Sequence, residues 1–486
     1  MSDIIFVPAP SASSTRDEQN SFYLSLMAGT APENVLQLRR VLNLKDLIIF
    51  GLILIQPVAS LPLFGHANDL SRGHAVSAIL VSMIGMVFTA ISYGRMANLF
   101  PAAGSAYTYV SKSLHPYIGF IAGWSMFLDY LLLPIICVIY CAITASHLFG
   151  IVPYTAWLVI FSLLFTALNL RGVKMAARTN GLLMIVMAVV VFWFMGAAIL
   201  YVSHRDGVAG LLSSRPFYDR QIFSWRPMAS ASALAALTYI GFDGITTLAE
   251  EVRNPRRNIL LATVLVCVIT GLWSGAQVYL AQLSWPDWQG LTRGLSPAAK
   301  NSALDTAILT IARRVGGSPL DFGLTLVLLV ASIGSGVAGA LGASRLLFGM
   351  GRDGIISRRF FGHLDKRYAT PTYNILLIGG ITLASTMFFD YEECAQLINF
   401  GAFLAFMGVN IGSMREYFFR KPEKTVRSLL VDFMPPFVGF CICLFIWLNL
   451  PLRTFIVGGS WMAAGVVYLG VQSRGFRADT EVIGFS

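Results

Sequence analysis

Charged residues are scarce in this chain. Asp, Glu, Lys and Arg make up 12% of its 486 residues, which is about half the fraction that soluble domains carry. Hydrophobic residues reach 56%, and the mean hydropathy is +0.68. Apolar runs long enough to cross a bilayer core, about 20 residues each, recur along the whole length. The composition excludes an ordinary soluble domain and indicates an all-α integral membrane protein with many spans.

Cysteine is also rare. The six cysteines form no CxxC pair and have no neighbouring histidine, so neither a disulfide framework nor a metal site is expected. The sequence also lacks an HExxH motif, a paired-histidine cluster, a Ser-His-Asp set and a Gly-rich phosphate-binding loop. We therefore expect no cofactor and no ATP-driven pumping, and a membrane-embedded enzyme has no motif in its favour.

The formal net charge of +10, with a pI near 9.4, does not indicate nucleic-acid binding here. Basic residues held in cytoplasmic loops give the same excess. Placing the N-terminus inside puts most Lys and Arg on the cytoplasmic side, and the exceptions lie in two long loops, 205–226 and 293–314. We expect a multi-pass protein of the cell inner (plasma) membrane with both termini cytoplasmic. The first ~40 residues show no signal-peptide pattern.

Length and polarity predict twelve transmembrane spans. They lie near 46–65, 75–98, 117–147, 154–170, 180–202, 229–251, 258–283, 320–348, 372–389, 392–413, 429–449 and 454–472.

Spans 1 and 6 each carry residues that interrupt a helix. In span 6, the stretch Tyr239–Glu251 holds two glycines on either side of Asp243, and glycine weakens a helix. In span 1, Pro57 and Pro62 each remove a backbone donor; a simple kink and an unwound segment are both open. Backbone freed at mid-membrane is tolerated only where it lines a protein cavity. Both interruptions are therefore candidate binding sites, and their positions in two halves fit an inverted-repeat transporter.

The second long loop contains a helical pattern. Apolar residues recur at helical spacing from Leu304 to Val315, beside Arg313 and Arg314. We expect a helix on the outer surface, which either caps the entrance or packs on the bundle without a gating role.

Several stretches resemble motifs of the amino acid–polyamine–organocation (APC) family of permeases. They are Phe100–Tyr109, Gly119–Trp124, Gly241–Asp243 with Ala249–Arg257, Ala343–Arg345 with Arg352–Gly354, and Thr370–Pro371. The resemblance covers roughly residues 38–475. Within the family, Gly104–Tyr109 and Gly123–Tyr130 look most like the bacterial putrescine importers and their relatives.

The resemblance implies a LeuT-like fold of two inverted five-helix repeats plus two extra helices. It also implies alternating access, with substrate held between spans 1, 3, 6 and 8. On this scheme the chain divides into a cytoplasmic tail (1–40), a first repeat of spans 1–5 (41–203), a second repeat of spans 6–10 (229–413), spans 11 and 12 (427–473) and a C-terminal cytoplasmic tail (474–486).

The resemblance places the substrate against the two interruptions. In family members that carry amino acids, a Gly-rich break in span 1 offers N–H groups to the carboxylate, and the break in span 6 offers carbonyls to the ammonium. The matching residues are Val58, Ala59 and Ser60 in span 1, and Ile240, Gly241, Phe242 and Asp243 in span 6. Because the span 1 segment contains no glycine, a carboxylate nest is less natural, and a substrate dominated by its amine is favoured.

Two of these residues have a second interpretation. Asp243 either neutralises an amine or caps the broken helix, because a charge at mid-membrane must be paired, hydrated or protonated. Phe242 either offers its ring face to a cation or is ordinary core.

The candidates for coupling are Asp129, Ser332 and Ser335. Asp129 lies in span 3, where an apolar setting favours the protonated carboxyl; we expect it to carry a proton, with a second amine or a bond to nearby backbone as alternatives. Ser332 and Ser335 share a helix face, where they either ligate Na⁺ with span 1 carbonyls or permit close packing, and we favour packing. Some relatives place a lysine of span 5 where that cation would sit, and none occurs between Asn180 and Tyr201.

The candidates for the cytoplasmic gate are Tyr107, Tyr109, Glu250 and Glu251. The tyrosines are either gate residues or interfacial anchors. The two glutamates, with nearby arginines, form either a gating network of ion pairs or a solvated face.

We therefore predict a secondary transporter that imports a small amine such as putrescine, or an amino acid, by symport with protons rather than sodium. A substrate–product antiporter and a nutrient sensor with a transporter fold are the alternatives. The expected partners are the substrate, the proton and the lipid bilayer.

Overall fold

The structure is a computed structural model that describes residues 42–101, 105–171, 177–352, 357–365 and 370–473. This described part is almost entirely helical and contains no β-strand. The α-helices are α2 (Leu44–Ile55), α3 (Phe64–Leu70), α4 (Ala75–Leu99), α5 (Ser105–Ser113), α6 (Pro116–Leu148), α7 (Tyr154–Leu170), α8 (Ala177–Asp206), α9 (Trp225–Ala235), α10 (Pro255–Ser284), α11 (Pro297–Asp305), α12 (Ala307–Arg352), α13 (Arg358–Phe361), α14 (Thr372–Ser385), α15 (Tyr391–Met414), α16 (Val426–Ser428), α17 (Met434–Leu448) and α18 (Leu452–Gln472). Short 3₁₀ and π segments are η1 (Val208–Leu212), η2 (Ala236–Tyr239), η3 (Phe242–Glu251), η4 (Arg415–Phe419) and η5 (Leu429–Phe433).

The helical lengths fit a membrane protein. Within the described residues, nine helical stretches are long and apolar enough to cross a membrane, and α7 and α14 are shorter apolar helices. The first predicted span is divided between α2 and α3 and does not appear as one helix. The count of twelve spans and the division into repeats stay predictions, and the two predicted tails lie outside the described residues.

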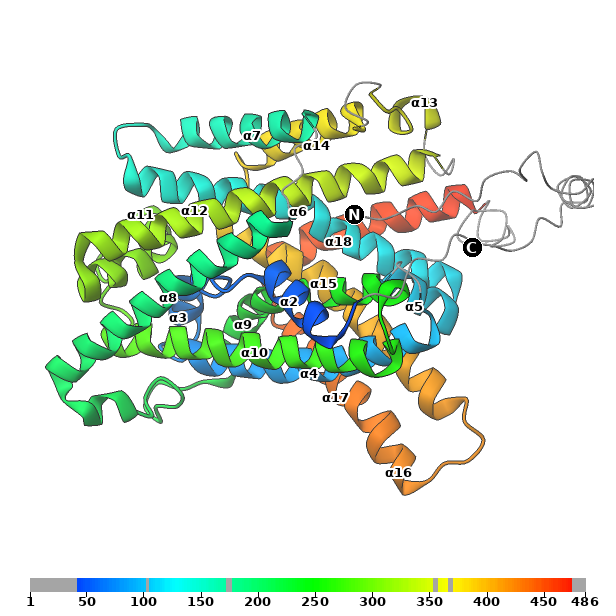
Figure 1. The fold of residues 1–486 in the computed structure, drawn as a ribbon, viewed down its shortest axis with the longest axis horizontal. Coiled ribbons are helices and arrows are strands. Elements are labelled where there is room, and N and C mark those ends of the chain that lie inside the picture. Colours follow the sequence, from blue (N-terminus) through cyan, green and yellow to red (C-terminus); the bar gives the residue numbers. More distant parts are fainter. Residues whose placement is uncertain (1–41, 102–104, 172–176, 353–356, 366–369, 474–486) are drawn as a thin grey trace, which may run out of the picture.

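The long helices lie side by side, with α6 and α15 at the centre (Figure 1). α15 packs against α4, α6 and α17, and α6 also packs along α12. Burial separates centre from edge. Of the 18-residue apolar stretch in each span, 83% is buried at Tyr391–Phe419 and 72% at Pro116–Leu148, against 22% at Gly181–Asp206 and at Leu452–Val471. The peripheral helices therefore present apolar side chains outward, as expected for contact with lipid.

The interruption of span 1 is confirmed. Asn43 caps α2 by accepting from the backbone N–H of Lys45 at 3.0 Å. α2 ends at Ile55, residues 56–63 are not α-helical, and α3 starts at Phe64. Gln56 has a φ of 69°, which a non-glycine residue rarely adopts. The alternative of a continuous, kinked helix is therefore wrong, and we call residues 56–63 the span 1 break.

Span 6 is also interrupted, although over a shorter stretch than predicted. α9 passes into η2, which ends at Tyr239, and η3 starts at Phe242 as a 3₁₀ helix. The expected unwinding from Ile240 to Gly244 is thus limited to Ile240 and Gly241, here called the span 6 break. Gly241 has a φ of 115°, a conformation that glycine alone adopts at low cost.

The predicted helix of the second long loop is present and is packed on the bundle. It consists of α11 and the start of α12, up to Gly317, where φ is 70°. Leu304, Ala307 and Ile311 are buried. A Cβ on Gly65 of α3 would lie 2.0 Å from the Leu304 carbonyl oxygen. This helix therefore sits directly against the second half of span 1.

Candidate functional site

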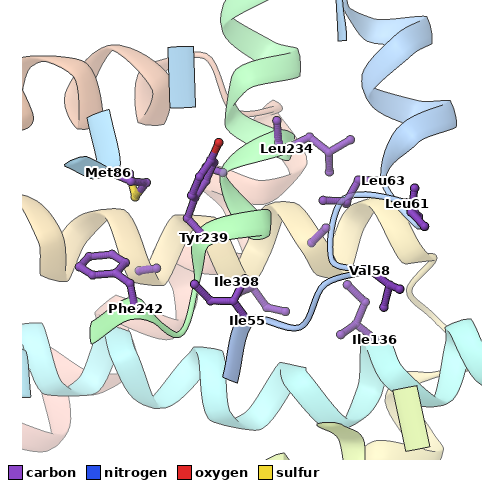
Figure 2. Packing of buried hydrophobic residues seen from close by; sticks show 14 of the residues in the cluster. Ile55, Val58, Leu61, Leu63, Met86, Ile136, Leu234, Tyr239, Phe242 and Ile398 are labelled. Atoms are coloured by element: carbon purple, nitrogen blue, oxygen red, sulfur yellow. The ribbon is translucent and has the colours of Figure 1, made fainter. Parts of the chain in front are cut away.

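The end of α2, directly before the span 1 break, packs against the span 6 break. A Cβ added at Gly241 would lie 3.6 Å from side-chain atoms of both Leu54 and Ile55. Figure 2 shows Ile55 near the segment of chain between Tyr239 and Phe242, whereas Val58 lies farther away, beside Ile136. The contact reaches the end of α2, and the joint binding of substrate by Val58, Ala59 and Ser60 with Ile240 to Asp243 stays a prediction.

Side chains of two other helices hold the span 1 break. Gln56 Nε2 donates to Ser335 Oγ at 2.7 Å and to the Ala331 carbonyl at 3.3 Å, both on α12. The Pro57 carbonyl accepts from Trp273 Nε1 at 2.8 Å and from Gln277 Nε2 at 3.0 Å, both on α10. Buried backbone groups need such partners when a helix is interrupted. These bonds give the Pro57 carbonyl its hydrogen-bond partners and stabilise the unusual backbone conformation of Gln56.

Some backbone groups of the span 1 break are left without partners. Among the described residues, no hydrogen bond uses the N–H groups of Val58 and Ser60 or the carbonyls of Ala59 and Ser60. Val58 and Ser60 are 2% and 1% exposed. The predicted substrate contacts would use these groups.

The span 6 break exposes carbonyls. Within the described part of the chain, no hydrogen bond reaches the carbonyl oxygens of Thr238, Tyr239 and Ile240. The backbone N–H groups of Gly241, Asp243 and Gly244 interact with the Asp243 carboxylate. This position agrees both with a cap on the broken helix and with a role in binding an amine, and the choice between them stays a prediction. The three carbonyls suit a cation.

Aromatic rings enclose this region. Phe242 is fully buried, and its ring lies 5.4 Å from that of Tyr93 on α4 and 5.4 Å from that of Phe406 on α15, measured between centroids. The Tyr93 hydroxyl is buried, is close enough to interact with the charge of Asp243, and has no hydrogen-bond partner among the described residues. Both interpretations of Phe242, as core and as pocket wall, agree with this packing.

Asp129 and Asp243 are close enough for their charges to interact. They are 9% and 7% exposed and come from α6 and η3. None of the ion pairs among the described residues includes either carboxylate. Two buried carboxylates without a cation are costly in a membrane. A bound cation or a bound proton would remove that cost.

The serines predicted for coupling have different surroundings. Ser335 accepts from Gln56, so its hydroxyl contacts span 1 through an amide. Ser332 Oγ instead donates to the Leu328 carbonyl of its own helix at 2.9 Å. The structure therefore brings one of the two hydroxyls to span 1.

The predicted gate tyrosines pack close to the same region. The Tyr109 ring is fully buried, 5.9 Å from that of Tyr93, and a Cβ on Gly123 would lie 3.2 Å from the Tyr107 ring. The Glu251 carbonyl accepts from the Leu42 N–H at 3.0 Å, which ties the end of η3 to the start of span 1. The side chain of Glu250 lies outside the described residues.

Sequence reasoning missed three residues: Gln56, Tyr93 and His66. Gln56 carried a signal, because it is an amide directly before Pro57 in an apolar run. Tyr93 gave none, since aromatic residues are common in spans. His66 lies just past the end of the predicted first span, and its partners, Asp305 and Glu392, are more than 200 positions away.

Comparisons with known proteins give a consistent picture. Residues 63–469 match the family described as amino acid permease. The low-affinity putrescine importer PlaP of Escherichia coli K12 is 32% identical over 444 residues, covering 91% of this chain and 95% of the relative. The branched-chain amino acid permease BcaP of Bacillus subtilis is 25% identical and covers 92% and 96%, and the methylthioribose transporter of the same species is 24% identical and covers 90% and 94%.

Proposed function

Because this chain belongs to the amino acid permease family, we propose that it imports a small amine, with putrescine as the first candidate, by proton symport and alternating access. It is a multi-pass membrane transporter of amines or amino acids rather than an enzyme. We choose an amine because Asp129 and Asp243 are buried carboxylates, and no cationic side chain among the described residues pairs with either of them.

The amine enters as the missing cation. One ammonium group lies between the Asp243 carboxylate and the acceptor-only carbonyls of Thr238, Tyr239 and Ile240. The Phe242 ring beside it contributes a cation–π contact, worth on the order of 1–2 kcal/mol where water is excluded. A diamine places its far end toward Asp129 when that carboxylate is charged. When Asp129 takes up a proton instead, the same group couples transport to the proton gradient.

An amino acid is the second candidate substrate. The free N–H groups of Val58 and Ser60 favour it, because they are positioned to donate to a carboxylate while the span 6 break accepts from the ammonium. The names of the relatives include both classes of substrate.

Purified protein in proteoliposomes tests the proposal. Uptake of labelled putrescine, lysine and leucine is measured with and without an inward proton gradient. We expect putrescine to accumulate when the outside is acidic. If the vesicles bind or transport leucine but take up no amine, the chain is assigned to amino acids. If none of the three compounds is taken up, the proposal is refuted.

Two variants test the assigned roles. Asp243→Asn should weaken putrescine binding by about 1–3 kcal/mol, as for a lost charged hydrogen bond. Asp129→Asn should spare binding and exchange while abolishing gradient-driven accumulation. Asp287→Asn is the matched control, because it removes an exposed carboxylate that pairs with Arg293 on the surface. Unchanged affinity in the first variant, or intact accumulation in the second, removes that residue from its role.

A further inference from the structure

A histidine lies between two carboxylates at the end of the bundle that the topology predicts to be external. His66 on α3 is 2% exposed. Its Nε2 lies 2.8 Å from Asp305 Oδ1 at the end of α11, and its Nδ1 lies 3.0 Å from Glu392 Oε2 at the start of α15. We call these three residues the outer cluster.

The hydrogen bonds define the charge of the ring. An ionised carboxylate only accepts hydrogen bonds, and a neutral imidazole has a single N–H. Because both ring nitrogens of His66 face carboxylate oxygens, both must donate, and the ring is an imidazolium. The outer cluster as seen in the structure therefore holds one proton more than it would with a neutral histidine.

The outer cluster joins three elements at a tightly packed position. α3 is the second half of the interrupted span 1, and α11 belongs to the long loop. α15 forms the most buried of the nine candidate spans among the described residues. Beside His66, a Cβ on Gly65 would lie 2.0 Å from the Leu304 carbonyl and 2.8 Å from the Ala307 Cβ. α3 therefore cannot move away from α11 and α15 without separating His66 from both carboxylates.

Water can reach this position. A pocket of about 330 Å³ is lined by His66, Asp69, Lys300 and Glu392, among others. Protons from the medium on that side can therefore enter and leave the outer cluster when it loosens.

The charged groups around His66 belong to α3, to α11 and to the start of α15. They are Asp69 on α3, Lys300 and Asp305 on α11, Asp390 at the N-cap of α15 and Glu392 in its first turn, with the Tyr391 ring 6.5 Å away. Asp69 pairs with Lys300 at 2.8 Å and so forms a second, separate contact between α3 and α11. Histidine is the side chain whose charge in water ordinarily changes between pH 5 and 8.

We propose that the outer cluster is a proton-binding site that keeps the outer side of the transporter closed while His66 is protonated. The inference rests on the proposed alternating access, since closure matters only if the outer side also opens. Opening moves the imidazole into water, where it loses its proton above about pH 6.5. The closed state then holds more protons than the open state, so a rise in external pH favours opening, by up to about tenfold per pH unit.

Thiol labelling from outside measures this equilibrium. Ala67→Cys on α3, where the native side chain is 2% exposed, reports opening through its reaction with a membrane-impermeant maleimide in right-side-out vesicles. Ser214→Cys, at an exposed position in the first long loop, corrects for the pH dependence of the reagent, and the chain without either cysteine gives the background. We expect the ratio of the two labelling rates to rise with external pH between about 6.5 and 8.5.

Variants identify the titrating group. In His66→Gln the ratio should no longer depend on pH and should equal the value that the native cluster reaches at the alkaline end. Lys300→Met, which breaks the neighbouring pair with Asp69, should raise the ratio at every pH and keep the slope. If His66→Gln fails to fold, Glu392→Gln serves instead, because an amide can donate to a neutral ring and should therefore reduce the slope.

A slope that persists in folded His66→Gln, an undiminished slope in Glu392→Gln, or the absence of a slope in the native chain would overturn the inference. Labelling needs no substrate, so its outcome is separate from that of the uptake assay. A chain that transports putrescine without a slope keeps the proposed function and loses the outer cluster as a proton site. A chain whose labelling ratio depends on pH but that transports none of the three substrates keeps the outer cluster as a proton site and loses the proposed function.

Discussion

The span 1 break is held by other helices, whereas the span 6 break is held by its own residues. The first contains no glycine. Its backbone is fixed by the Gln56 side chain, which donates to Ser335 on α12, and by Trp273 and Gln277 of α10. The second is formed around Gly241, with a φ of 115°, and around the Asp243 carboxylate that binds its N–H groups. One interruption therefore depends on tertiary structure and the other on local sequence.

This difference affects what each break offers to a ligand. Neighbouring helices occupy the Pro57 carbonyl and leave the span 1 break with a mixture of donors and acceptors. At the span 6 break the Asp243 carboxylate lies beside backbone N–H groups, and the carbonyls of Thr238, Tyr239 and Ile240 have no partner among the described residues. The acceptor character of the site is therefore a property of span 6. Substitutions that loosen one break and not the other test this separation.

Gly241→Ala should have the largest effect. Its added methyl meets atoms at an ordinary contact distance of 3.6 Å, so the cost comes from the backbone, where a φ of 115° is strained for alanine by about 1–3 kcal/mol. We expect uptake to be lost. We also expect the rate of amide hydrogen exchange to increase more at residues 240–251 than at residues 56–63.

Gly196→Ala on α8 is the control for this substitution. A methyl there meets nothing within 4 Å, and alanine favours a helix interior by up to about 1 kcal/mol. Gly196→Ala should therefore leave both the uptake rate and the rates of amide hydrogen exchange unchanged. Equal loosening of both breaks in Gly241→Ala would contradict the local origin of the span 6 break.

The same contrast explains how far the sequence could predict the structure. Gly241 and the two prolines of span 1 are local signals, so both interruptions could be located without coordinates. The width of the span 6 break could not, because Phe242 to Glu251 continue as a 3₁₀ helix that depends on packing against α2. Twelve spans and inverted repeats followed from hydropathy and resemblance, and the structure describes helices without testing that symmetry.

Part of the candidate site also escaped prediction. Asp129 and Asp243 were expected because a carboxylate is conspicuous in an apolar span. Gln56 and Ser335 meet across 279 positions, and His66 meets Asp305 and Glu392 across 239 and 326. Single-sequence patterns contain no information on such distant pairs. The contact between Ser335 and the Gln56 amide arises from tertiary packing, so the sequence alone could not predict it.

Gln56→Leu should have an intermediate effect, confined to span 1. It removes two hydrogen bonds to α12 and leaves the Ser335 hydroxyl and the Ala331 carbonyl without their partner, at a cost of about 1–3 kcal/mol. The φ of 69° at this residue is then no longer supported, and hydrogen exchange should increase at residues 56–63 but not at 236–244.

Ser332→Ala is the matched control for Gln56→Leu, because that hydroxyl bonds to its own helix. It should change stability by less than about 0.5 kcal/mol, as at sites without a tertiary role.

Replacing external Na⁺ with K⁺ should also leave uptake unchanged, because Ser335 already accepts a hydrogen bond from the Gln56 amide. Sodium-dependent uptake that Ser332→Ala abolishes would restore the cation-ligand interpretation of the two serines.

Trp273→Phe should have the smallest effect. It removes the indole N–H that donates to the Pro57 carbonyl and retains an aromatic ring beside Phe192, whose centroid lies 4.9 Å from that of Trp273. Gln277 still donates to the same carbonyl, so the loss should be about 1 kcal/mol or less. Adding Gln277→Leu leaves that buried carbonyl with no donor, and the double variant should lose more stability than the two single variants together. Thermal unfolding in detergent measures all three. Strict additivity would mean that the two donors do not share the task of holding the span 1 break.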